Sequence, residues 1–167
     1  MKNFSLLFFL LFFYCACQNN PTIAEDYSHI PEAFNIKVAI PAGQIADNQF
    51  LPYIGNFTYL DQAELVGVLT LSTSQPIGTE LVVRPLGTLV LKENHQEKLI
   101  IIASPLDTAL QLSKTTNFQE FIAANAGEKQ IIQDWFLYQK GLGKVELIGW
   151  KDEKYALEKV KKALSNN

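Results

Sequence analysis

Short segments of alternating or continuous apolar residues dominate the first part of the chain and return once near its end. The pattern predicts strands over residues 34–40, 65–71, 80–91, 98–103 and 144–149. The segment 98–103 (KLIIIA) is strongly apolar and is expected to be buried on both faces. Pro85 and Gly87 interrupt the long strand, which is typical of a bulge or a barrel corner.

Helical periodicity appears in the last third of the chain. Asn117 is a good cap for a short helix over 117–124, and longer helices are expected over 128–138 and 152–164. The inner side of the first long helix should carry Ile131, Ile132, Trp135, Phe136 and Tyr138, and that of the second should carry Tyr155, Ala156, Val160, Ala163 and Leu164. We therefore expect an α+β, mainly β fold, with a five-stranded β-barrel and two main helices packed on it.

The first residues have the features of an export signal. Lys2 precedes an apolar run of eight residues, 6–13, which is too short to span a bilayer. The following residues, Tyr14-Cys15-Ala16-Cys17, resemble a lipobox that departs from the usual pattern at Tyr14. We expect residues 1–16 to be a lipoprotein signal peptide and Cys17 to be the lipidated residue. An ordinary signal cut elsewhere, an uncleaved anchor and a buried apolar segment are the alternatives.

This interpretation predicts a location and a domain organisation. Two or more acyl chains on Cys17 would suffice for stable membrane attachment, so the membrane is an expected partner and the cell envelope the expected location. The membrane leaflet stays open. Residues 17–28 are polar and would be the tether, and residues 29–167 would form one domain. Cys15 and Cys17 are the only cysteines, so this domain has neither a disulfide nor a cysteine-based metal site.

Charge and size narrow the classes of function. Without the signal, about 150 residues remain, which suits a single domain with its own core. The chain has 14 basic and 17 acidic residues and a formal net charge of −3, and Arg84 is its only arginine. This composition argues against nucleic acid as a partner.

Four segments in order resemble the soluble family I inorganic pyrophosphatases. They are KVAIPAG (37–43), VRPLGTL (83–89), KLIIIA (98–103), and WFLY (135–138) followed by VELIGW (145–150). The resemblance runs from about residue 30 to residue 164 and implies an OB-like five-stranded barrel. It also implies multi-metal chemistry, in which carboxylates hold several Mg²⁺ ions that activate water, while Lys, Arg and Tyr side chains hold phosphate.

The metal-binding motif of that family, D-x-D-P-x-D-V-L, is largely replaced in this chain. Its third aspartate aligns with Gly67 and its second with Glu64. The first aligns with Gln62, and Asp61 lies one residue out of register. A glutamate of the family's first strand aligns with Ala39. A glycine and an alanine offer no side-chain ligand, so most of the expected carboxylates are missing.

A few candidate site residues remain. The two aspartates of the later hairpin fall near Glu93 and Gln96, while Lys98 and Tyr138 match the family. The candidate metal ligands are therefore Asp61, Glu64 and Glu93, and the candidate catalytic residues are Glu64, Lys98 and Tyr138. Each also has a plainer interpretation: Glu64 as a solvated carboxylate, Lys98 as a surface charge, and Tyr138 as a packing residue.

Two main hypotheses follow. The first is a membrane-anchored, catalytically degenerate pyrophosphatase-like domain, a pseudoenzyme that works as a binding or interaction module. It would have no cofactor and would take a small anion, a phosphate-containing ligand or a protein partner. The alternative is an active Mg²⁺-dependent hydrolase that cleaves pyrophosphate at a rearranged site. A purely structural envelope lipoprotein is a third possibility, and whether the chain forms an oligomer stays open.

Overall fold

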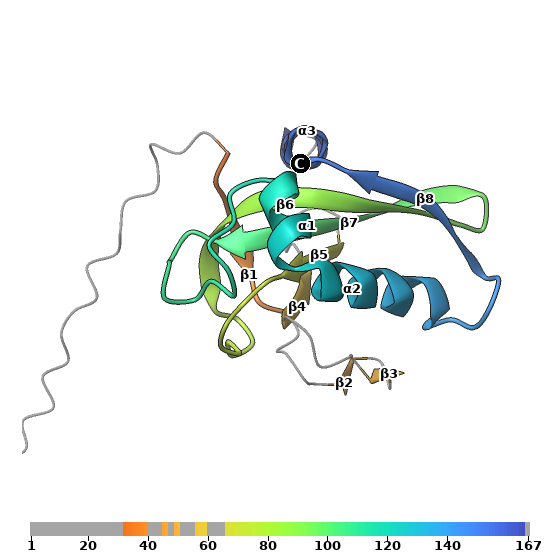
Figure 1. Cartoon of the computed structure of the whole chain (residues 1–167), viewed down its shortest axis with the longest axis horizontal. Helices are drawn as coiled ribbons and strands as arrows, with labels where there is room; N and C mark the ends of the chain where they lie inside the picture. Colours follow the sequence, from red (N-terminus) through yellow and green to blue (C-terminus); the bar gives the residue numbers. More distant parts are fainter. Residues whose placement is uncertain (1–31, 40–44, 47–48, 51–55, 60–65, 166–167) are drawn as a thin grey trace, which may run out of the picture.

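The computed structural model describes residues 32–39, 45–46, 49–50, 56–59 and 66–165. Its main sheet has the strand order β1-β6-β7-β5-β4 (Figure 1). A further strand, β8, lies outside this order and pairs with β6. These strands are β1 (Phe34–Lys37), β4 (Asn56–Tyr59), β5 (Val66–Leu69), β6 (Glu80–Glu93), β7 (Gln96–Pro105) and β8 (Val145–Lys151). Two short strands, β2 (Ile45–Ala46) and β3 (Gln49–Phe50), form a separate pair.

The long hairpin of β6 and β7 organises the sheet. Its strands are joined by a two-residue turn at Asn94 and His95, which both have positive φ angles. The predicted irregularity is confirmed, since the register of β6 against β7 shifts between Pro85 and Gly87. A Cβ atom at Gly87 would lie 2.7 Å from Phe118 Cδ2 and 2.9 Å from the carbonyl oxygen of Lys151. This position therefore needs glycine for close packing.

The bent strand β6 pairs with two different strands along one of its edges. Its first residues pair with β1 and its last residues with β8, while β7 follows the other edge. At the two ends of the strand path, β1 and β4 contact each other, so the sheet curls toward a barrel. The mainly β architecture expected from the sequence is confirmed.

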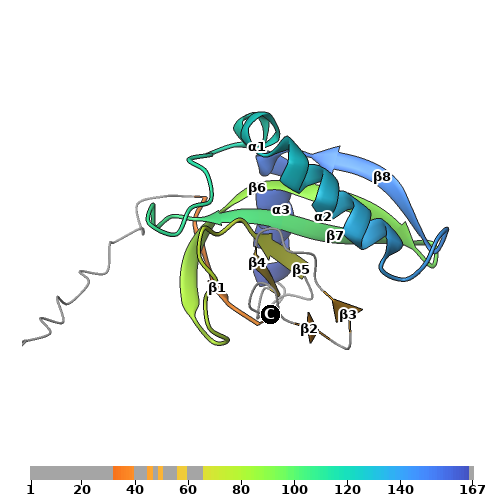
Figure 2. The same ribbon diagram turned by 60° about the horizontal axis from the view of Figure 1, so that its bottom comes forward.

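Helices cover both faces of the curved sheet (Figure 2). They are α1 (Phe118–Ala124), α2 (Ala126–Tyr138) and α3 (Glu153–Ser165). Side chains of α1 and α2 pack with Ile100 and Ile102 of β7, whereas those of α3 pack with Ile101. Successive residues of a strand point to opposite faces, so β7 is buried on both sides, as predicted.

The helix boundaries agree with the expected positions to within two residues. The Asn117 side chain accepts a hydrogen bond of 3.0 Å from the backbone N–H of Glu120, which confirms the predicted cap. Two side chains assigned to inner faces are instead exposed: Tyr138 and Leu164, in the last turns of α2 and α3, are 52% and 42% exposed. Within the described residues, no helix is both long and apolar enough to cross a membrane.

Candidate functional site

Glu93 lies at the end of β6, where its backbone is held from two sides. It pairs with Gln96 of β7 and with Val145 of β8. Its side chain is only 17% exposed and lies on the same face of β6 as the buried residue Leu91. Glu93 is therefore a positioned carboxylate at the rim of the core formed with α1 and α2.

Lys98 reaches Glu93 across the hairpin. Because Glu93 pairs with Gln96, residue 98 occupies the diagonal position on the same face of the neighbouring strand. The distance from Lys98 Nζ to Glu93 Oε2 is 3.6 Å, and the lysine side chain is 31% exposed. The structure thus brings two of the predicted site residues together as an ion pair.

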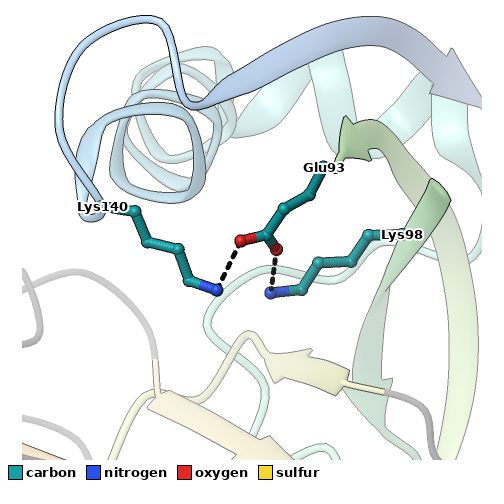
Figure 3. Close-up of polar contacts among 3 residues, drawn as sticks. All are labelled: Glu93, Lys98 and Lys140. Carbon is teal, nitrogen blue, oxygen red and sulfur yellow. Dashed lines mark hydrogen bonds and ion pairs between the residues drawn. The ribbon is translucent and has the colours of Figure 1, made fainter. Parts of the chain in front are cut away.

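Lys140 approaches the same carboxylate from another direction (Figure 3). It follows α2 in a turn in which Gly141, at a φ of 97°, donates its backbone N–H to the carbonyl oxygen of Tyr138 at 2.8 Å. Glycine accepts this left-handed conformation at no steric cost. Lys140 Nζ then donates a hydrogen bond of 2.5 Å to Glu93 Oε1, so each carboxylate oxygen faces one ammonium group.

The three residues form a charge cluster, the Glu93–Lys98–Lys140 cluster. The hydrogen bond from Lys140 is the largest cause that lowers the pKa of Glu93, and the positive charges of both lysines act in the same direction against the opposing effect of burial. Glu93 is accordingly held as a carboxylate, and the cluster has one positive charge in excess.

Tyr138 lies two residues before Lys140, at the end of α2. Its side chain is 52% exposed, so it does not belong to the buried stripe of the helix. Tyr138 is therefore not a core residue. Its position beside the lysine turn leaves it accessible to a ligand in solution.

The described part of the site does not fit a Mg²⁺ cluster. Among residues 66–165 and the shorter described stretches, no group of three His, Cys, Asp or Glu side chains could hold a metal ion. Gly67 is buried within β5, between Thr58 of β4 and Ile101 of β7, and it contributes no ligand. Glu93 remains, but both of its oxygens are engaged by lysines. Mg²⁺ binds through oxygen ligands in near-octahedral geometry, which this arrangement does not supply.

Several predictions concern residues outside the described ones. Asp61 and Glu64, the other candidate metal ligands, lie there, as does the predicted lipidation residue Cys17. Their roles stay predictions.

Sequence reasoning assigned Glu93 to metal and Lys98 to substrate, and it missed their contact with each other. The hairpin register could have revealed this pair, because a two-residue turn at 94–95 makes 93 and 98 diagonal neighbours. No comparable signal exists for Lys140, which lies 47 residues from Glu93 and meets it only through tertiary packing.

Comparisons with known proteins agree on one family. A family model described as inorganic pyrophosphatase matches residues 22–167. An inorganic pyrophosphatase of Mesorhizobium japonicum is 28% identical over an alignment of length 162, and the match covers 80% of this chain and 89% of the relative. Inorganic pyrophosphatases of Thermus thermophilus and Coxiella burnetii have similar structures, with TM-scores of 0.67 and 0.59. The Thermus thermophilus protein is 21% identical, and the match covers 83% of this chain and 92% of that protein's chain. The Coxiella burnetii protein is 16% identical, and the match covers 81% of this chain and 95% of that protein's chain. These structures share the fold and confirm the expected OB-like architecture.

Proposed function

Because the chain belongs to the inorganic pyrophosphatase family, we propose that it is a lipid-anchored member that has lost multi-metal hydrolysis and acts as a binding or interaction module. The observation that carries this proposal is the pairing of the Glu93 carboxylate with two lysines. The carboxylate that the family resemblance assigns to metal is instead paired with Lys98 and Lys140. A cation would have to displace two ammonium groups before it could bind there.

Two replaced positions of the chain support the same conclusion. Gly67 and Ala39 stand where the resemblance expects an aspartate and a glutamate, and neither has a side-chain oxygen. Mg²⁺ gives up its water reluctantly and needs several well-placed oxygen ligands, so the loss of these carboxylates weakens every ion of a shared cluster.

The ligand of the module is proposed to be a small anion or a phosphate-containing molecule. Lys98 and Lys140 outnumber Glu93 by one positive charge, and the half-exposed Tyr138 lies next to them. Ammonium groups and a phenolic hydroxyl are suitable donors to phosphate oxygens. Binding without hydrolysis would need only these donors and no metal.

Phosphate release from pyrophosphate tests the loss of hydrolysis. The assay would use Mg²⁺ and, separately, Mn²⁺, with the Mesorhizobium japonicum relative as a positive control. We expect turnover below about 1 s⁻¹, the low end of ordinary enzymes. Faster turnover that disappears in the Glu64→Gln variant would instead establish the second candidate, an active Mg²⁺-dependent diphosphatase. The family match over nearly all of the chain is the observation that favours this candidate.

Lipidation at Cys17 is tested separately. The full chain would be expressed in a bacterial host that is fed an alkyne-tagged fatty acid, and the label on the protein would be measured after coupling to a fluorophore. We expect label on the wild-type chain and none on the Cys17→Ala variant, while Cys15→Ala should still be labelled because Cys15 leaves with the signal. Equal labelling of the wild-type and Cys17→Ala chains would contradict the anchor.

A further inference from the structure

We propose that Lys140 is the residue that closes Glu93 to divalent cations, because its ammonium group occupies the position that a metal ion would need on the carboxylate. This inference rests on the proposed loss of metal-dependent hydrolysis and names Lys140 as a residue that contributes to this loss. It makes Lys140 a determinant of ligand specificity, which keeps the Glu93–Lys98–Lys140 cluster open to anions and closed to metals.

The distance between the two groups supports direct replacement. Lys140 Nζ lies 2.5 Å from Glu93 Oε1. Divalent cations lie at about 2.0–2.6 Å from their oxygen ligands, so the nitrogen already occupies this shell. Lys98 Nζ lies 3.6 Å from the second oxygen, where it opposes a bidentate metal contact. The carboxylate therefore has a built-in cation on one side and a second positive charge on the other.

The surrounding backbone holds Lys140 in this place. Gly141 closes the end of α2 by a left-handed turn, and Glu93 is fixed by pairing with both β7 and β8. The lysine and the carboxylate come from elements far apart in the sequence and converge at the rim of the core (Figure 3). Another pair lacks this support at its carboxylate: Lys92 Nζ and Glu146 Oε2 lie 3.7 Å apart, and Glu146 is 72% exposed against 17% for Glu93. The two lysines, Lys92 and Lys140, are 43% and 45% exposed, so it is the carboxylate that differs.

Manganese binding to the full chain tests the inference without relying on catalysis. Mn²⁺ would be titrated into the detergent-solubilised protein, and binding would be followed by water-proton relaxation, which detects weak sites. The variants are Lys140→Met, which removes the positive charge, and Lys140→Glu, which also adds an oxygen ligand beside Glu93. Lys92→Met and Lys92→Glu are matched controls, because they make the same charge changes at the exposed pair on the same strand.

We expect Mn²⁺ affinity to rise from wild type to Lys140→Met to Lys140→Glu, with the last at least about tenfold tighter than wild type. Adding Glu93→Gln should abolish both gains, and the Lys92 variants should match wild type. Thermal melts without metal would verify that every variant is folded. Equal affinity in wild type and both Lys140 variants would overturn the inference, as would wild-type Mn²⁺ binding that Glu93→Gln abolishes.

The result of this Mn²⁺ test can be told apart from the result of the test of the proposed function. If the wild-type protein hydrolyses pyrophosphate through other carboxylates, the proposed function fails. The role of Lys140 is still decided in that case, because each Lys140 variant is compared with the double variant that also carries Glu93→Gln. If hydrolysis is absent and the Lys140 variants gain no affinity, the function stands and the specificity role of Lys140 is wrong.

Discussion

The last residues of β6 present two lysine–glutamate arrangements on opposite faces of the same strand. On the face toward α1 and α2, called the inner face here, Glu93 is 17% exposed and is held by Lys98 and Lys140; on the opposite face, Lys92 pairs with a Glu146 side chain that is 72% exposed. The residue types are the same, but only the inner carboxylate is supported by a packed core and by three separate elements. The difference shows that tertiary context, rather than residue type, separates a positioned charge from a solvated one.

The largest expected effect on the free energy of unfolding comes from Leu91, the core residue two positions before Glu93 on the same face of β6. Leu91 is fully buried among α2-facing core residues, so Leu91→Ala should lower the free energy of unfolding by about 2–5 kcal/mol. Lys92→Ala, one residue along and on the other face, should change it by less than about 0.5 kcal/mol. Urea denaturation of both variants measures this contrast, and similar values would mean that Lys92 is packed as tightly as Leu91 at this end of the strand.

A smaller difference is expected for the carboxylates themselves. Glu93→Gln leaves Lys98 and Lys140 facing each other without a negative charge and should cost about 1 kcal/mol, whereas Glu146→Gln should cost close to zero. The free energies of unfolding of both variants at pH 7 provide the test. A cost for Glu146→Gln as large as that for Glu93→Gln would remove the distinction between the two arrangements.

The smallest expected effect is a pH dependence of the stability that Glu93 contributes. The pKa of Glu93 is lowered in the folded protein from its ordinary value of 4.5, chiefly by the hydrogen bond from Lys140. Its ionised form therefore contributes stability that is fully present well above pH 4.5 and is lost as the pH falls through the lowered pKa. The stability difference between wild type and Glu93→Gln should shrink between pH 6 and pH 3. A difference that grows on acidification would contradict this sign.

Much of the fold could be predicted because its signals are local. The strongly apolar segment at 98–103 corresponds to a strand that is buried on both faces, and Asn117 caps α1 as its sequence position indicated. Pro85 and Gly87 marked the bend in β6 because a strand interior rarely contains either residue. The burial of two residues in the last turns of helices was predicted wrongly. Tyr138 and Leu164 fit the apolar periodicity, but their side chains are 52% and 42% exposed.

The candidate site was predicted only in part, for a physical reason. Alignment with a family motif identifies residue types, so Glu93 and Lys98 were found, but it does not say which charges neutralise each other. Asp61 and Glu64 remain predictions outside the described residues. The pairing of Glu93 with Lys140 changes the chemical meaning of the carboxylate, because an engaged carboxylate is a poor metal ligand.

The sequence by itself determined the mainly β architecture, the position of the bulge, the family, and the replacement of metal-binding positions by Gly67 and Ala39. These properties depend on local periodicity and on residue identity. Only the tertiary structure decided that Lys140 meets Glu93, since the turn after α2 and the end of a strand 47 residues earlier come together at the rim of one core. Charge–charge interactions weaken steeply with distance and exposure, so their consequences depend on such three-dimensional placement.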